Sequence, residues 1–523
     1  MTDLATDIAV VAAAIAVLGL LAPLPGLRPE PQRAASLALL LGAWGFLIAS
    51  LIPGDDASDA LDKLGSPARA AMGAVALVVA IVVVVVVVRL ITARPTIWFV
   101  LLGVALPIRV PVSVGSLEAN LLIPLYAVIG IGIIAWVWAR ARGRVGPADE
   151  APAALAWPLA AFAAFVLVSA TWSPDGEEAA IKAAFFYVPF TILLVLVIAW
   201  WRYARALRAL AITTIAGGTI AALVALWQYA TEDIWWNQTL IQANVYSRFF
   251  RVNGIFFDPN ILGRYLAIGI LICLALAWVR PRAAELAALA GAIAVMTAGL
   301  AVTFSRSSTL MLMVGVLLLA VRAVGARRAI TAGAAVLVVA GGIAMLTSDN
   351  VRRAATDYDR LERVSEGRFD LMRGGLTIWR DEPVLGTGLG GFEERFEETL
   401  TPTEQRRVRV VISHNTPVTV LSETGVVGFA LFLVLLVGAG WAAVRGSRDQ
   451  GLDGWARWTL GAILAGIVVH SLLYAALFED PFTWVAAAAA VAIGLLALPR
   501  TAAGDPEPDE EAPSPTATMP VTP

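Results

Sequence analysis

His414 is one of only two histidines in a chain of 523 residues, and its surroundings suggest acid–base chemistry. The imidazole is the side chain that takes up a proton near neutral pH. After Asn415 come nine residues and then Gly425-Val426-Val427-Gly428. Asn415 or Thr416 can cap a helix here and Pro417 can occupy its first turn, so the cap needs no histidine. His414 is therefore a candidate general base, the alternative being a histidine of a solvated capping region.

Two further side chains could assist or replace that base. Glu423 lies one or two helical turns after His414 between apolar residues, where it could orient the imidazole or contact a substrate hydroxyl. His470, the second histidine, lies in the second half of a late apolar segment. For His470 the pattern favours a hydrogen-bonded packing residue over a second base.

Two arginines stand where an anion could bind. Arg306 lies in the short turn Ser305-Arg306-Ser307 between two apolar segments, and Arg251 precedes a helix start at Asp258-Pro259-Asn260. Guanidinium binds phosphate with two parallel hydrogen bonds, and a helix N-terminus favours negative charge. We therefore expect both arginines to bind one anionic group. The alternative for Arg306 is an interaction with lipid headgroups, and Asp258 or Asn260 can serve as plain helix caps.

Composition places these residues in a membrane protein. Hydrophobic residues make up 59% of the chain and charged residues 15%, whereas soluble domains hold about 45–50% and about 25%. The net charge of −2 argues against a nucleic-acid partner. A single cysteine, Cys273, excludes a disulfide framework or a cysteine metal cluster. Asp357-Tyr358-Asp359 is too common a loop pattern to predict a metal site, and the acidic start Thr2–Asp7 does not resemble a cleavable signal.

Apolar stretches of about twenty residues predict an all-α, polytopic helical bundle. We expect about 12–15 transmembrane helices, and the pattern marks about fifteen segments. They are 8–26, 34–53, 70–93, 95–113, 120–139, 153–172, 183–201, 209–230, 261–279, 284–304, 308–321, 329–347, 416–443, 457–478 and 482–499. The Pro-, Glu- and Asp-rich tail 501–523 is expected to be disordered.

The connections between these segments alternate between basic and acidic. By the positive-inside rule the basic set is cytoplasmic, which puts the N-terminus outside and the C-terminus inside the plasma (inner) membrane. The basic set comprises Arg28, Arg33, Arg89, Arg94, Arg140, Arg142, Arg144, Arg202, Arg205, Arg208, Arg280, Arg282, Arg322, Arg327, Arg328, Arg445 and Arg448. The acidic set comprises Asp55, Asp56, Asp59, Asp62, Glu118, Asp175, Glu177, Glu178, Glu232, Asp233, Glu479 and Asp480.

This topology divides the chain into four parts. Residues 1–230 form N-terminal transmembrane helices, and 444–500 form C-terminal ones ahead of the cytoplasmic tail 501–523. The catalytic core is 231–443, with the long outer connections 231–260 and 348–415, which we expect to meet above the membrane. Arginines that break the positive-inside rule gather there, namely Arg248, Arg251, Arg306, Arg368, Arg373, Arg380, Arg395, Arg406, Arg407 and Arg409. Long loops translocate regardless of charge, but the turn at Arg306 is too short for that explanation.

The large outer connection should contain short amphipathic helices. Phe369, Met372, Leu376 and Trp379 recur at helical spacing and predict a helix over 366–380 that lies at the membrane interface. The run Gly386–Phe392 follows Pro383. It lacks the lysine and hydroxyl residue of a nucleotide-binding loop, so we expect it to let backbone pass close to a substrate or a neighbouring helix.

Together these segments resemble the O-antigen ligase and O-antigen polymerase family of membrane glycosyltransferases. The resemblance rests on His414-Asn415 with Gly425 and Gly428, and on Arg306-Ser307-Ser308-Thr309-Leu310. The segments 251–260 and 368–388 are similar to two further family blocks, so the resemblance covers about 230–440. About fifteen helices exceed the family's usual number of about twelve, which leaves the correspondence of the N-terminal helices open.

The resemblance implies a GT-C-like fold and a function. The family transfers a glycan from a polyprenyl-diphosphate donor to an acceptor hydroxyl on the extracytoplasmic face, inverting the anomeric centre, without a metal or other cofactor. His414 would be the general base, and Arg306 and Arg251 would bind the diphosphate together with Arg248 and Arg368. Asn415 and Glu423 would orient groups or contact sugar. The partners are the lipid-linked glycan, membrane lipids and an acceptor that is a glycan, a lipid or a protein.

Two alternatives remain open from the sequence. A polysaccharide polymerase of the same family would join repeat units instead of attaching finished glycan to a different molecule, and the His-Asn and glycine pattern favours a ligase. A transporter of small anions would place charged residues near the middle of its helices. In this chain the ionisable residues gather toward one predicted face, which favours an enzyme.

Overall fold

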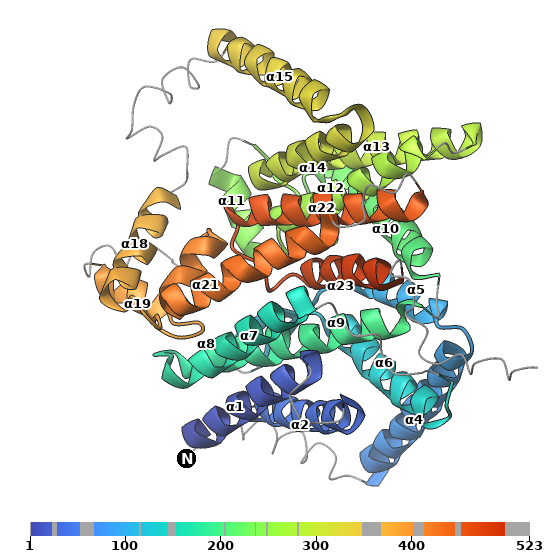
Figure 1. Cartoon of the computed structure of the whole chain (residues 1–523), viewed down its shortest axis with the longest axis vertical. Helices are drawn as coiled ribbons and strands as arrows, with labels where there is room; N and C mark the ends of the chain where they lie inside the picture. The colour runs from blue at the N-terminus through green and yellow to red at the C-terminus, as the bar shows by residue number, and fades with distance from the viewer. Residues whose placement is uncertain are drawn as a thin grey trace, which may run out of the picture.

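The computed structural model describes residues 2–22, 29–52, 67–114, 117–144, 153–202, 205–235, 237–246, 249–279, 282–347, 368–400, 413–444 and 451–496. Helices dominate this part of the chain, so the prediction of an all-α polytopic bundle is confirmed (Figure 1). Eleven described helices are long and apolar enough to cross a membrane, and three shorter ones are apolar too. The predicted tail 501–523 lies outside the described residues.

Every predicted apolar segment coincides with a helix, although the bounds shift by a few residues. The helices of the first half are α1 Thr2–Leu21, α2 Pro29–Ser50, α4 Pro67–Ala93, α5 Thr96–Ala105, α6 Ile123–Ala141, α7 Ala153–Ser169, α8 Gly176–Lys182, α9 Val188–Trp201 and α10 Ala206–Thr231. Those of the second half are α11 Gln238–Tyr246, α12 Pro259–Trp278, α13 Ala283–Thr303, α14 Arg306–Val324, α15 Ala326–Thr347, α18 Arg368–Asp381, α19 Phe392–Thr399, α21 Thr416–Val444, α22 Leu452–Ser471 and α23 Pro481–Leu496.

Two of the predicted segments end early. The segment 95–113 is helical only as far as Ala105, and an antiparallel hairpin of β1 Val110–Val114 and β2 Leu117–Leu121 follows, with Val110 opposite Leu121. Pro107 cannot continue the helix, and alternating β-branched residues favour a strand. The segment 457–478 stops at Ser471. The carbonyls of Leu472 and Phe478 instead accept hydrogen bonds from the side chains of Asn415 and Trp484.

The core gathers around α9, α12 and α23, whose described residues are mostly buried. Helix α12 packs between α13, α14 and α10, while α22 packs against α14 and α23. Glycines permit some of the closest approaches. Gly299 of α13 lies against Ala222 of α10, and Gly218 and Gly269 both lie against Met296. Small residues bring helix backbones together in membrane proteins, where burial of apolar surface gives little driving force.

One end of the bundle carries the predicted functional residues, and we call it the His414 end. Helices α12, α14, α21 and α23 begin there, and α13 and α22 end there, because successive helices run antiparallel. Helices α8, α11, α18 and α19 lie at the same side of the molecule in Figure 1. Four helix N-termini at one end favour negative charge in that region.

The amphipathic helix is α18, but its packed face differs from the predicted stripe. The buried face is formed by Gly375 and Ile378, which pack with Phe392 and Phe396 of α19, whereas Leu376 of the predicted stripe is exposed. A side chain at Gly374 or Gly375 would collide with Phe396 or Val418, so the glycine pair allows the close packing. Glycines add nothing to an apolar pattern, so the sequence could not reveal their part in this contact face.

Candidate functional site

His414 has an unusual backbone conformation at the entrance to α21. Its φ of 54° lies in the left-handed region, which is uncommon for residues other than glycine, and its side chain is half-buried. Asn415 caps the helix, since its Oδ1 accepts the N–H of Val418 at 3.0 Å, while Ser413 Oγ accepts the N–H of Asn415 at 3.1 Å. The predicted cap is confirmed, and it uses no atom of the His414 imidazole. Such backbone strain persists where surrounding contacts impose it, which often occurs at functional sites.

The end of α22 connects the His414 segment to the Arg306 turn. Asn415 Nδ2 donates to the carbonyl of Leu472 at 3.0 Å. His470, in the last turn of α22, lies two residues before Leu472. Its Nε2 is 3.1 Å from Oγ of Ser307, the residue that follows Arg306. His470 is fully buried, as expected for a packing residue. The residues adjoining His414 and Arg306 are thus fixed to the same helical turn.

The structure brings Arg251 to the turn that carries Arg306. Arg251 Nε donates to the carbonyl of Thr303 at 3.1 Å, three residues before Arg306. The side chain of Asn244 bonds both the N–H and the carbonyl of Arg251, at 3.0 and 2.9 Å, which fixes this loop backbone. Arg306 is the first residue of α14 and is exposed. Arg248 lies outside the described residues, and of Arg368 only the backbone at the start of α18 is described.

A group of hydroxyl and amide side chains holds the starts of α12 and α14 together. Ser305 caps α14 and its Oγ lies 2.8 Å from Asn260 Oδ1, while Ser308 Oγ donates to the Asn260 carbonyl at 3.0 Å. Asp258 caps α12 by accepting the N–H of Asn260. The cap predicted at Asp258 or Asn260 is therefore Asp258, and Asn260 serves the contact between the helices.

Glu423 is paired with a lysine that sequence reasoning missed. Lys182 Nζ lies 3.2 Å from Glu423 Oε1 and 3.9 Å from Glu178 Oε1, and the Lys182 and Glu423 side chains are about nine-tenths buried. A π-helical turn, Ala183–Tyr187, directly follows Lys182, and such turns are frequent at functional sites. The available signal was a lysine directly before the predicted apolar segment 183–201.

A small polar cavity lies beside this ion pair, and we call it the acidic cavity. Its volume is about 50 Å³. The cavity lies at the start of α21, where its lining residue Thr416 follows His414 by two residues. The lining residues are Lys182, Tyr187, Leu389, Thr416, Thr419, Val420, Glu423, Ala475, Ala476, Leu477, Phe478 and Glu479.

A second buried ion pair lies at the same end of the bundle. Arg264 Nε of α12 lies 2.7 Å from Asp480 Oδ2, just before α23, and both side chains are 2% exposed. Glu479 interacts electrostatically with Lys182, Glu423, Arg109 and Arg264, and burial raises its pKa above the usual value of a carboxyl group. The sequence suggested no role for Lys182 or Arg264. Arg264 is an isolated charge near the start of an apolar helix, which is the pattern that could have revealed it.

Helix α21 is broken at Gly425, and the predicted glycine run fills the break. Gly425 has φ 61° and ψ −165°. In an unbroken helix the N–H groups of Val426 and Val427 would bond to the carbonyls of Ser422 and Glu423. Instead they donate to Pro383 and Val384, while Ser422 and Glu423 accept from Thr387 and Gly388. The predicted close approach of glycine backbone to a neighbouring helix is thus observed.

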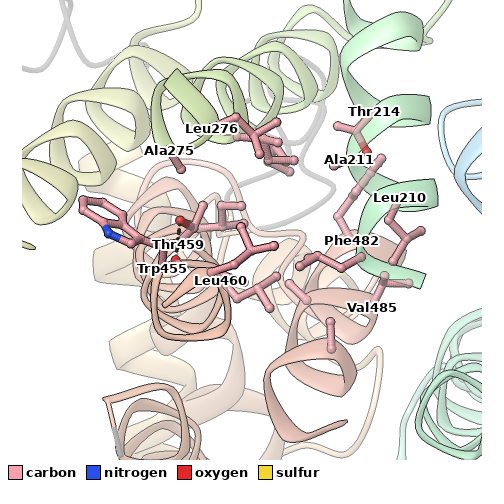
Figure 2. A pocket seen from close by; sticks show the side chains of 18 of the residues that line it. Leu210, Ala211, Thr214, Ala275, Leu276, Trp455, Thr459, Leu460, Phe482 and Val485 are labelled. Carbon is pink, nitrogen blue, oxygen red and sulfur yellow. Dashed lines mark hydrogen bonds between the residues drawn. The ribbon is translucent and has the colours of Figure 1, made fainter. Parts of the chain in front are cut away.

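Two of the larger cavities are apolar and carry no acid–base residue. One of about 120 Å³ lies between α10, α12, α22 and α23, and Figure 2 shows it lined by hydrocarbon, with Thr459 bonded to the carbonyl of Trp455. The other, of about 400 Å³, lies between α7, α9, α21, α22 and α23 and shares Leu477 and Phe478 with the acidic cavity. Neither lining contains a charged side chain or a histidine. No group of three metal-ligating side chains occurs within the described ranges.

The long apolar helices define a multi-pass membrane protein, and the candidate anion-binding arginines and the candidate base lie at one end of its bundle. Residues 291–433 match the family model described as O-antigen ligase, which confirms the resemblance over this range. The match includes Arg306, His414, Gly425 and Gly428 but not Arg251. It supports membrane glycosyltransferase activity of the ligase and polymerase class, with a lipid-linked glycan and an acceptor as partners. No curated protein matches the chain.

Proposed function

We propose that the protein transfers a glycan from a polyprenyl-diphosphate donor to an acceptor hydroxyl at the outer face of the membrane. The attachment of the residues next to His414 and Arg306 to one helix end carries this proposal: Asn415 bonds Leu472 and Ser307 bonds His470. The segments that carry the candidate base and the candidate diphosphate ligand are more than a hundred residues apart in the sequence. Both lie beside the end of α22. The bond from Arg251 to the carbonyl of Thr303 brings a second guanidinium close to the turn that carries Arg306.

The chemistry requires few groups. Arg306 and Arg251, with Arg248 and Arg368 as further candidates, hold the diphosphate and stabilise the negative charge that grows on it as it leaves. His414 takes the proton of the acceptor hydroxyl while its oxygen forms the bond to the anomeric carbon. The carbon–oxygen bond to the diphosphate breaks, and attack from the opposite side inverts the centre. Diphosphate is a stable leaving group, so the step needs no metal and no strong acid.

Positive-inside bias supports an orientation with the N-terminus outside and the C-terminus in the cytoplasm. The His414 end then faces the extracytoplasmic side, where a flipped lipid-linked glycan is accessible. An acceptor that already carries repeat units would make the reaction a polymerisation, whereas a different acceptor molecule makes it a ligation. The family description favours ligation.

The test replaces His414 with glutamine and measures glycan transfer by purified protein from a polyprenyl-diphosphate glycan. Glutamine retains hydrogen bonding but cannot take up the proton. We expect transfer to fall by about 10²–10⁴-fold while donor binding and protein yield stay near parental values. His470→Gln is the matched control, and we expect it to retain most of the activity. Parental transfer rates in His414→Gln would refute the base assignment.

A further inference from the structure

The acidic cavity contains a buried hydroxyl group that the fold does not use. Thr416 is 5% exposed, lines the cavity, and its Oγ1 has no hydrogen-bond partner among the described residues. A buried hydroxyl without a partner is unfavourable, so native structures normally pair one with protein, water or ligand. Thr424 on the same helix shows the usual arrangement, since its hydroxyl bonds the carbonyl of Val420. The hydroxyl of Thr416 is therefore available for a ligand.

The other polar groups of the cavity suit a hydroxylated ligand. Glu423 supplies a carboxylate acceptor and Lys182 a donor, and the Glu479 carboxyl group and the Thr416 hydroxyl can donate or accept. The bond from Lys182 uses one oxygen of Glu423 and fixes the orientation of the carboxylate. Lys182, the cation among the lining residues, is already paired with Glu423, so the lining leaves no unpaired positive charge for a phosphate group. Arg251 and Arg306, the candidate diphosphate ligands, lie beyond the end of α22. The two sites therefore differ in charge: that of the arginines suits anions, and the acidic cavity suits neutral polar groups.

Size and position restrict the ligand further. A single water needs about 10–15 Å³, so a cavity of about 50 Å³ admits a hydroxyl or hydroxymethyl group but not a sugar ring. Thr416 follows His414 by two residues at the start of α21. A group held in the cavity would therefore place the rest of its sugar beside the segment that carries His414.

We propose that the acidic cavity is the acceptor-binding subsite: Thr416, Glu423 and Lys182 bind a hydroxyl or hydroxymethyl group of the acceptor sugar and so position its neighbouring hydroxyl against His414. This inference rests on the proposed glycosyl transfer, which it extends by naming a sugar as the acceptor. Thr416 and Lys182 are binding and positioning residues, and the proton is removed by His414.

Binding of simple probes to the purified protein in detergent tests the proposal. The probes are the methyl glycosides of glucose, galactose, mannose and N-acetylglucosamine, followed by saturation-transfer NMR, and inorganic pyrophosphate, followed by calorimetry. Thr416→Val keeps the shape and loses no hydrogen bond within the described structure, so we expect it to fold. We expect its affinity for the glycoside that binds best to fall about tenfold with unchanged pyrophosphate binding. Thr416→Ser restores the hydroxyl and should restore glycoside affinity.

Thr424→Val is the matched control, because its hydroxyl bonds only its own helix, and we expect parental glycoside affinity. Equal glycoside affinity in the parent, Thr416→Val and Thr424→Val would overturn the proposal, and so would the absence of binding of all four glycosides. Arg306→Ala should weaken pyrophosphate binding alone. If it does not, while Thr416→Val still weakens glycoside binding, the donor site of the proposed function fails and the acceptor subsite stands.

Discussion

At the scale of single residues, the site depends on how each charged side chain is held. Arg251 is fixed through its Nε to a backbone carbonyl, which leaves the two terminal nitrogens of the guanidinium to contact a ligand. Lys182 is held by Glu423 inside the bundle, where removing one partner leaves a buried charge that costs about 3–5 kcal/mol. The exposed Arg306 can be replaced with little loss of stability, whereas the buried lysine cannot.

The first residue-scale prediction concerns the shape of the guanidinium. Arg306→Lys and Arg251→Lys keep the positive charge but lose the planar fork that contacts two phosphate oxygens. We expect each variant to lose most donor turnover, with a fall of about tenfold or more, while thermal stability stays within about 0.5 kcal/mol for the exposed Arg306. Transfer assays and thermal unfolding measure the two effects. Full activity in both variants would exclude the diphosphate role.

The second residue-scale prediction concerns pH. Burial raises the pKa of Glu479, so the folded state favours the protonated carboxyl group. Its contribution to stability is present below the pKa of the unfolded chain and is lost as the pH rises through the raised pKa. Glu479→Gln cannot ionise, so we expect its Tm relative to the parent to increase with pH. Thermal unfolding of both proteins from pH 4 to pH 9 measures this, and a constant difference would show that Glu479 does not titrate differently on folding.

At the scale of elements, the break in α21 joins the outer helices to the transmembrane bundle. Four backbone hydrogen bonds connect residues 383–388 to 422–427 across the break. The same loop touches the connection between α7 and α8, where a side chain at Gly388 or Gly390 would meet Ser169, Ser173 or Glu178. The glycine run is therefore held between α21 and α8, the two helices that carry Glu423 and Lys182.

Gly425→Ala tests the break. The φ and ψ values of Gly425 are almost confined to glycine, and an added Cβ would collide with the carbonyl of Val384. We expect a destabilisation of about 2 kcal/mol or more, measured by thermal unfolding in detergent, and reduced transfer. Gly440→Ala is the matched control on the same helix, since nothing lies within 4 Å of its added Cβ. The control should be neutral or slightly stabilising, and equal behaviour of the two variants would argue against a required break.

At the scale of the whole molecule, antiparallel helices bring distant segments to one end. The outer connections 231–260 and 348–415 both adjoin the segment between α22 and α23, through the interaction of Asp258 with Tyr474 and the bond from Asn415 to Leu472. Their predicted meeting above the membrane remains a prediction, because residues 348–367 and 401–412 lie outside the described residues. The buried ion pairs Lys182–Glu423 and Arg264–Asp480 lie toward this end as well.

Cysteine labelling tests which end faces outward. Arg395 lies on α19 with its side chain 39% exposed, and the chain's own Cys273 is buried, so background reaction should be low. We expect Arg395→Cys to react with an impermeant thiol reagent in intact cells. Arg208→Cys, at the opposite end of the bundle, should react only after permeabilisation. The reverse pattern would invert the topology and remove the site from the extracytoplasmic face.

The amino-acid sequence by itself determined the helical bundle, a helix cap at Asn415 or Thr416 and the candidate residues His414, Arg251 and Arg306. These are local properties: apolar length, cap chemistry and charge at helix ends follow from a few neighbouring residues. Only the tertiary structure showed that Lys182 pairs with Glu423, and that Gly386–Gly388 completes the broken α21. It also showed that α18 packs against α19 through Gly374, Gly375 and Ile378. Such pairings join segments tens to hundreds of residues apart, and their partners are decided by packing geometry, which no local pattern of the sequence contains.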